Sequence, residues 1–261
     1  MVRSTQRVQF PGHADNLLAG IMELPEGSPQ GFLLFSHCFT CGKDLKAIVR
    51  ISRGLADKGW GVLRYDFSGL GNSQGDFSST NFTTNREDLR AAVTFMEREY
   101  QPPAFLIGHS FGGATSLSMA MELTSVRGAI AIASPSDTHH LASLLESMNP
   151  EIVSRGDSSV SIGGRAHWIK RQMLEDFRSY DLQSVVRLIT KPILAFHSPT
   201  DETVDFRNAL VNCCLDASVQ SPHLRQRSLI SLPNCNHLLT TSDVDCVMVV
   251  EIADAWCKRF V

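Results

Sequence analysis

The residues best suited to chemistry surround Ser110, in the sequence Gly-His-Ser-Phe-Gly at residues 108–112. A short apolar run precedes this Gly-x-Ser-x-Gly pattern and a helix-forming run, 114–123, follows it, as in a nucleophile elbow. A serine on so sharp a turn has strained backbone geometry, and Gly108 and Gly112 let other chain segments pass without a Cβ clash. We therefore predict that Ser110 is a nucleophile at the mouth of a sheet. The alternative is a glycine-rich turn with an incidental serine.

A serine hydroxyl is a weak nucleophile near neutral pH, so it needs a base in hydrogen-bonding contact and an acid that holds the base. Two later loops supply candidates, each directly after a predicted strand. Asp201 follows the strand 192–196, and His237 follows the last strand, 227–232. This order and these positions predict a catalytic triad of Ser110, Asp201 and His237.

Other residues near these loops compete for the same roles. Glu202 and Asp205 are alternative acids, and His197 and His223 are alternative bases. His197 lies at a strand end beside the acid loop and His223 precedes the last strand, so both are poorly placed to reach a serine. A solvated surface residue is the ordinary alternative for any single aspartate or histidine in a loop.

The negative charge that develops during acyl transfer needs two donors, which form an oxyanion hole. One is expected from the residue after the nucleophile, and the other from the loop after the strand 32–35. We predict the backbone N–H groups of Phe111 and Phe39. The alternative for the Phe39 loop is an ordinary strand-to-helix turn.

The elements that must position these residues alternate along the chain. Strands are predicted at 7–10, 17–24, 32–35, 60–67, 103–107, 128–133, 191–196 and 227–232, and helices at 45–56, 86–100, 114–123, 204–215 and 244–260. Such alternation predicts the α/β class, with right-handed crossovers and a mostly parallel sheet that has helices on both faces.

The alternation breaks between residues 134 and 190. This segment contains two prolines, a polar stretch at 154–161 and a hairpin signal at Gly163 and Gly164. It is too long for a connection and too short for a domain. We predict one domain, 1–261, with a lid inserted above the site at about 134–190.

Composition excludes several classes of protein. The 24 Lys and Arg against 27 Asp and Glu give a net charge of −3, and no basic cluster suggests a nucleic-acid partner. The N-terminus has no signal-peptide core and no apolar run approaches a membrane span, so we expect a cytoplasmic protein that does not enter a membrane. The seven cysteines, with Cys213 and Cys214 adjacent, are typical of reduced thiols.

The pair Cys38 and Cys41 leaves several interpretations open. A strand, then Cys-x-x-Cys, then a helix is also the pattern of a thioredoxin-type redox site. A metal site would need a second ligand pair that no spacing provides, so we expect no metal. The expected serine chemistry also needs no organic cofactor. In a modulating role, oxidation would pull on the loop and displace the Phe39 donor. In the structural alternative, Cys38 packs behind the loop and Cys41 is an inert buried thiol.

Taken together, these positions resemble the α/β-hydrolase superfamily over nearly the whole chain. The loop 69–73 is similar to that superfamily's turn after the fourth strand. The segments 37–44, 75–77 and 199–204 resemble, more narrowly, the hydrolase half of proteins that fuse an α/β hydrolase to an OsmC-like peroxidase domain. Size and lid are similar to cinnamoyl and feruloyl esterases. The resemblance implies an eight-stranded sheet and carboxylic-ester hydrolysis through an acyl-enzyme.

Two departures from these relatives matter for function. Most of the superfamily has Gly where Cys38 stands, and the peroxidase domain of the fusion proteins is absent from this chain. A stand-alone relative and a truncated fusion protein both stay open, as does a homo-oligomer. We expect a serine esterase that acts on a small-molecule ester. The alternative is a non-catalytic or redox-modulated binding module on the same fold that uses Cys38 and Cys41.

Overall fold

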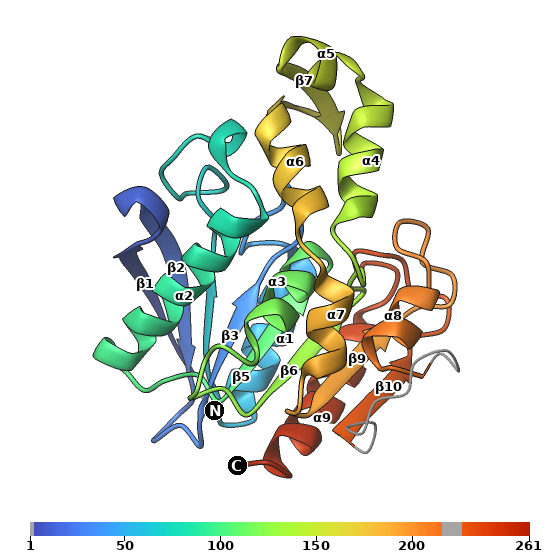
Figure 1. Ribbon diagram of the computed structural model, residues 1–261. Helices are drawn as coiled ribbons and strands as arrows, with labels where there is room; N and C mark the ends of the chain where they lie inside the picture. Colours follow the sequence, from blue (N-terminus) through green and yellow to red (C-terminus); the bar gives the residue numbers. More distant parts are fainter. Residues whose placement is uncertain (1–2, 216–225) are drawn as a thin grey trace.

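A computed structural model of the chain describes residues 3–215 and 226–261. Its elements form three layers, a central sheet with helices on both faces (Figure 1). The strands are β1 (Ser4–Pro11), β2 (Leu17–Leu24), β3 (Phe32–Ser36), β4 (Gly61–Tyr65), β5 (Phe105–His109), β6 (Gly128–Ile132), β7 (Asp157–Ile162), β8 (Arg165–Lys170), β9 (Ile193–His197) and β10 (Arg227–Ser231). The helices are α1 (Lys46–Asp57), α2 (Phe82–Glu99), α3 (Phe111–Met119), α4 (His139–Met148), α5 (Glu151–Arg155), α6 (Arg171–Ser179), α7 (Leu182–Leu188), α8 (Arg207–Asn212) and α9 (Asp243–Lys258), with short 3₁₀ turns at η1 (His13–Asp15) and η2 (Phe77–Ser79).

The main sheet has eight strands in the order β1-β2-β4-β3-β5-β6-β9-β10. The two opening strands pair antiparallel with each other and with β4, and all later pairs are parallel. The predicted α/β class and the eight-stranded α/β-hydrolase sheet are therefore confirmed. Because parallel strands end at the same edge of a sheet, the loops after β3, β5, β9 and β10 meet there.

Both faces of the sheet are buried, which explains why its central strands are continuous apolar runs. In β3, Leu33 and Phe35 pack in the core under α1 and α9, whereas Phe32 and Leu34 pack in the core that includes residues of α2. Figure 1 shows α2, α3 and α7 on one face and α1 and α9 on the other. This packing holds the carboxyl ends of the strands in fixed positions beneath the site.

The segment predicted as an insertion contains α4, α5, a hairpin of β7 and β8, and α6, which project beyond the carboxyl edge of the sheet (Figure 1). The end of β8 and the helix α6 are joined to the rest of the domain by polar contacts. Lys170 Nζ lies 2.7 Å from Ser79 Oγ, and Asp176 Oδ1 accepts a hydrogen bond of 2.8 Å from the N–H of Phe82 at the start of α2. The next helix, α7, packs against α3 in the body of the domain.

Three helices begin at least three residues away from the predicted start, and local hydrogen bonds explain two of these differences. The helix predicted from 86 starts at Phe82, because Asn81 and Thr84 form a capping box. The helix predicted at 204–215 is only α8, because Asp201 and Asp205 bond the backbone of the loop before it. The helix predicted from 114 starts at residue 111, directly after Ser110.

Candidate active site

Ser110 lies between β5 and α3 with φ 53° and ψ −121°. A positive φ is uncommon for a residue other than glycine, and it marks a strained position that the surrounding structure must hold. The N–H of Ser110 donates to the carbonyl of Ile132 at 2.8 Å, and its own carbonyl accepts from Gly113 at 2.8 Å. The serine is therefore fixed on a sharp turn, as the sequence predicts.

The glycines around Ser110 are required by close backbone approach. A Cβ on Gly108 would lie 2.1 Å from the carbonyl oxygen of Gly112, and one on Gly112 would lie 2.3 Å from that of Ser36. Both distances are far inside van der Waals contact, so neither position accepts a larger residue without backbone movement. The predicted role of these two glycines is confirmed.

His237, in the loop after β10, lies between Ser110 and Asp201. Its Nε2 is 2.9 Å from Ser110 Oγ, and its Nδ1 is 2.9 Å and 3.1 Å from the two carboxylate oxygens of Asp201. A carboxylate only accepts hydrogen bonds, so Nδ1 carries the proton and Nε2 is free to accept the Ser110 O–H. The structure thus brings the three sequence-predicted residues into one hydrogen-bonded chain.

Asp201 is held as an anion although its side chain is only 1% exposed. Burial by itself raises the pKa of this carboxyl, but hydrogen bonds from His237 and from the N–H groups of Val204 and Thr203 outweigh burial and lower the pKa below its usual value. An ionised Asp201 favours the His237 tautomer that leaves Nε2 unprotonated.

The alternative acids and bases make contacts other than those of a catalytic triad. Glu202 lies with its carboxylate 3.4 Å from the backbone nitrogen of His237, and Asp205 accepts from the N–H of Arg207 at 2.7 Å. His197 Nε2 lies 2.7 Å from the carbonyl of Val204, behind Asp201. Each of these three is occupied away from Ser110. His223 lies outside the described residues.

The predicted oxyanion donors, Phe39 and Phe111, line the same cavity as Ser110, and their rings are in contact with centroids 5.6 Å apart. Phe111 is the first residue of α3, so its N–H has no acceptor within the helix. Cys38 and Cys41 form a disulfide across the Phe39 turn, with Cα atoms 5.3 Å apart. The expectation of reduced thiols is therefore wrong for this pair, because the turn brings their Cα atoms within bonding reach.

A cavity of about 370 Å³ opens over Ser110. One wall is apolar and comes from the inserted segment. It consists of Leu141, Leu144, Leu145 and Met148 of α4 with Ile162 of the hairpin. Polar groups from the loop after β9, Glu202 and Thr203, line it as well. The site can therefore hold an apolar group near the serine, with polar side chains also in the lining.

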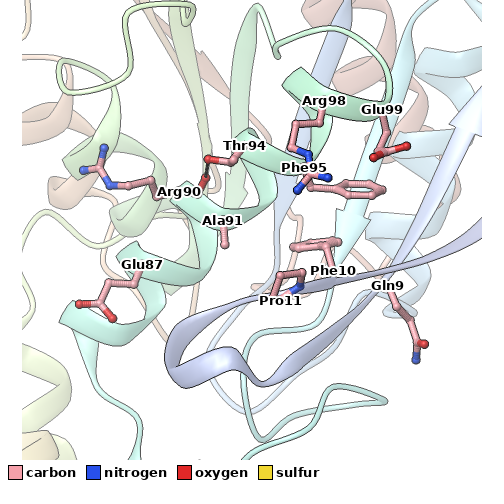
Figure 2. Close-up of a pocket in the computed structure, with 10 residues that line it drawn as sticks. All are labelled: Gln9, Phe10, Pro11, Glu87, Arg90, Ala91, Thr94, Phe95, Arg98 and Glu99. Atoms are coloured by element: carbon pink, nitrogen blue, oxygen red, sulfur yellow. Dashed lines mark hydrogen bonds between the residues drawn. The ribbon is translucent and has the colours of Figure 1, made fainter.

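A hollow of about 440 Å³ lies away from this site, between β1 and α2 (Figure 2). Its floor is the stacked pair Phe10 and Phe95, and Arg90, Arg98 and other side chains of α2 rim it. It shares no lining residue with the cavity over Ser110. The one hydroxyl among its lining residues, Thr94, donates to the backbone carbonyl of Arg90 at 3.1 Å rather than to a base, so the chemistry of the chain is better placed at Ser110.

Sequence reasoning missed His109, which supports the histidine of the site. Its Nε2 lies 2.8 Å from the carbonyl oxygen of His237. Burial, and next the neighbouring His237, lower the pKa of His109 to about 3, so it is neutral and donates to this carbonyl through Nε2. The sequence feature that could have indicated this role is the position of His109 directly before Ser110.

A buried ion pair that the sequence did not suggest holds the end of the loop that carries Phe39. Lys43 Nζ lies 2.8 Å from Asp66 Oδ2 and 2.8 Å from Asn72 Oδ1, and the Lys43 N–H donates to Asp66 Oδ1 at 2.6 Å. Lys43 is only 4% exposed. The loop that carries Phe39 is thereby joined to the loop after β4.

Within 3–215 and 226–261, no three His, Cys, Asp or Glu side chains are grouped to hold a metal ion. Over the same ranges, none of the helices combines the length and apolar character that a membrane span needs.

Residues 27–155 match the family described as serine aminopeptidase, S33. The monoglyceride lipase of Rattus norvegicus is 32% identical over 149 residues, which are 52% of this chain and 48% of that protein. The chain thus spans about half the length of this curated relative.

Solved structures extend the similarity to the whole chain. The esterase domain of a Rhodothermus marinus protein is 37% identical with a TM-score of 0.76, covering 98% of this chain and 99% of that one. Est1E from Butyrivibrio proteoclasticus, solved with ferulic acid, shares the fold at 18% identity with a TM-score of 0.77, covering 97% of this chain and 99% of that one. The chain therefore belongs to the α/β-hydrolase superfamily.

Proposed function

We propose that this chain hydrolyses carboxylic esters through Ser110 as nucleophile, with His237 as general base and Asp201 as the acid that orients it. The observation that carries the proposal is the hydrogen-bonded chain from Asp201 through His237 Nδ1 and Nε2 to Ser110 Oγ. His237 takes the Ser110 proton as Oγ attacks the ester carbonyl, and returns it to the leaving alcohol. Water then releases the acid from the acyl-enzyme by the same steps.

The backbone N–H groups of Phe39 and Phe111 are proposed to stabilise the oxyanion. Both residues line the cavity at Ser110, and the N-terminus of α3 directs its positive end toward the same point. A single donor of this kind contributes about 3 kcal/mol to the transition state. No metal or organic cofactor takes part in the proposed reaction.

The acyl group is proposed to be apolar and of small to medium size. This is supported by the cavity of about 370 Å³ and by its wall of leucine and methionine side chains from α4. One relative is a monoglyceride lipase and one structural neighbour holds ferulic acid, so fatty and aromatic acyl groups are both candidates. The inserted segment at about 134–190 would then act as the lid of a single domain, 1–261.

Location and assembly are predictions from the sequence. We propose that the protein is cytoplasmic and acts on a free small-molecule ester, without nucleic-acid or membrane partners. A homo-oligomer and an OsmC-like peroxidase domain in relatives stay predictions. Size-exclusion chromatography with light scattering would test the first, and the full-length sequences of relatives would test the second.

The decisive experiment compares Ser110→Ala with Ser118→Ala, a buried serine further along the same helix. Ser110→Ala should abolish hydrolysis of an activated ester and labelling by a fluorophosphonate, while its melting temperature stays near that of wild type. Ser118→Ala should keep both activities. Labelling of Ser110→Ala at the wild-type rate would refute the proposal. A screen of wild type across acyl lengths, aromatic esters, thioesters and amides would then define the substrate.

A further inference from the structure

The loop that presents Phe39 contains a tight turn closed by a disulfide. The N–H of Cys41 donates to the carbonyl of Cys38 at 3.2 Å, so residues 38–41 form a β-turn. The Cys38–Cys41 disulfide joins the two ends of the same turn. Phe39 and Thr40 are its central residues, and the N–H of Phe39 is one of the two proposed oxyanion donors.

Thr40 adopts a backbone conformation that its side chain disfavours. Its φ is 58°, in the left-handed region where a β-branched residue is an outlier. A turn with positive φ at its third residue normally has Gly or Asn there. The local sequence therefore opposes the turn that the structure contains, and a constraint from outside the backbone must hold it.

Neighbouring contacts fix the two ends of the loop, and the buried ring of His37 lies with Nδ1 2.7 Å from the carbonyl oxygen of Cys38, which belongs to the same peptide unit as the Phe39 N–H. On one side the loop leaves β3, and on the other Lys43 is bonded to Asp66. Between these anchors, the Phe39 ring makes edge contacts, including one with Phe111 at 5.6 Å. Ring contacts hold a side chain without fixing the direction of its backbone N–H. The disulfide adds a covalent link across Phe39 and Thr40, beyond the His37 contact at the first residue of the turn.

We propose that the Cys38–Cys41 disulfide is a positioning element of the oxyanion hole, which holds Thr40 in its left-handed conformation so that the Phe39 N–H points at the reacting carbonyl. The inference rests on the proposed esterase function. Reduction by a dithiol lowers turnover and reoxidation restores it. This is opposite in direction to the expectation from sequence, in which oxidation displaced the donor, because the bonded pair is the state in which Phe39 faces the site.

The redox step is an ordinary thiol–disulfide exchange. A thiolate of the dithiol attacks one sulfur of the pair, and its second thiol then closes a ring on the reagent and releases both cysteines. Two electrons and two protons pass from the dithiol to Cys38 and Cys41. Cys38 is 4% exposed and Cys41 is half-buried on the cavity, so Cys41 is the sulfur within reach.

The other cysteines offer no competing explanation for an effect of reductant. Cys213, Cys214, Cys235, Cys246 and Cys257 are all free thiols and all buried. Burial raises the pKa of Cys213 and of Cys235 to about 12, so neither forms a thiolate near neutral pH. A dithiol therefore changes the covalent structure of the chain only at the Phe39 turn.

The test measures kcat and KM for an activated ester before and after treatment with dithiothreitol, with mass spectrometry of alkylated Cys38 and Cys41 to verify the redox state. Wild type should lose roughly 10²-fold in kcat on reduction, the size expected for loss of one oxyanion donor, with little change in KM. Cys41→Ser should have the kcat of reduced wild type, and dithiothreitol should not change it. Reoxidation should restore wild type only.

Two substitutions of Thr40 separate positioning from general damage. Thr40→Gly allows the left-handed conformation without a disulfide, so its ratio of reduced to oxidised kcat should be close to one. Thr40→Val keeps the β-branch and should stay as sensitive as wild type. The ratio within each variant is the readout, so a change in absolute activity or stability does not obscure it.

The outcomes distinguish this inference from the proposed function. If wild type with a verified reduced pair keeps its oxidised kcat, or if Thr40→Gly is as sensitive as Thr40→Val, the positioning role is wrong while the esterase stands. If oxidised wild type hydrolyses no ester and takes no fluorophosphonate, the proposed function itself fails.

Discussion

At the elbow, backbone segments approach so closely that a Cβ on Gly112 would lie 2.3 Å from a carbonyl oxygen, whereas a Cβ on Gly163 in the inserted hairpin would meet nothing within 4 Å. The burial of the side chains differs in the same way between the two regions. All residues of α3 are buried, but Leu144 and Met148 of α4 are 41% and 45% exposed. Both regions line one cavity.

The difference assigns separate tasks to the two regions. Close packing fixes the atoms that would react to within fractions of an ångström, as a catalytic constellation requires. The inserted segment contributes side-chain surface that can change without disturbing the sheet. We therefore expect substitutions in the elbow to have large effects on every substrate, and substitutions in the inserted segment to have graded effects on particular substrates.

The largest contrast is expected between Gly112→Ala and Gly163→Ala. The first forces a Cβ into the backbone of Ser36 and His37, so the free energy of unfolding should fall by more than about 4 kcal/mol and ester hydrolysis should be lost. The second has open space but a φ of +58°, so it should cost about 1 kcal/mol. Urea unfolding and an ester assay measure both. Comparable losses in the two variants would contradict the comparison.

Asp201→Asn is expected to have the second-largest effect. An amide can donate to His237 Nδ1 and thereby favour the wrong tautomer, so kcat should fall by roughly 10³–10⁴-fold while the fold is kept. Glu202→Gln is the matched control, because Glu202 adjoins Asp201 and its carboxylate lies 3.4 Å from the backbone nitrogen of His237 rather than at its ring. It should stay near wild type in a kinetic assay. A larger loss from Glu202→Gln would assign the acid role to Glu202.

His109→Gln should change how stability depends on pH. The folded state lowers the pKa of His109 from 6.5 to about 3, so the unfolded chain binds a proton there first as the pH falls. This proton leaves the free energy of unfolding unchanged above about pH 6.5 and lowers it progressively as the pH falls from 6.5 toward 3. At pH 5 the loss is on the order of 2 kcal/mol, or about 5 °C in Tm.

The glutamine variant lacks this titration but keeps an N–H for the carbonyl of His237. Its Tm should therefore fall less between pH 7 and pH 5 than that of wild type. Burial also lowers the pKa of His37 and of His197, and both remain in the variant, so the difference between the two proteins isolates His109. Equal slopes would show that His109 is not buried as a neutral ring.

The smallest effects are expected on α4. Leu144→Ser and Met148→Ser each remove apolar surface from the acyl side of the cavity, so kcat/KM for an octanoyl ester should fall about fivefold, equivalent to about 1 kcal/mol, and that for an acetyl ester should not change. Val247→Ser is a control on α9, 57% exposed and remote from the cavity. Equal loss on both esters would place these side chains outside the acyl site.

The order of elements and the contact among Ser110, His237 and Asp201 could be predicted because each depends on a strong local pattern. Apolar runs mark buried strands, and residues that follow parallel strands meet at one edge. The two glycines at the elbow identify the close approach. Local patterns of this kind depend little on distant parts of the chain.

The oxyanion loop could not be predicted to the same degree. Thr40 occupies a conformation that its type disfavours, so the sequence contains no sign of the turn. Lys43 and Asp66 are charged residues, which are usually solvated, and only the folded chain makes them a buried pair. The contacts of Lys170 and Asp176 with the body are polar and join distant segments, so no periodicity reports them.

Two consecutive residues of the elbow hold His237 from different sides, Ser110 at the ring and His109 at the backbone carbonyl. His237 follows His109 by 128 positions. At roughly 5–20 residues per second, a ribosome needs on the order of ten seconds to make that stretch. During this interval Ser110 is an ordinary alcohol without a base. On the proposed mechanism, a nascent chain therefore stays inert toward esters until His237 has been synthesised and has reached the elbow.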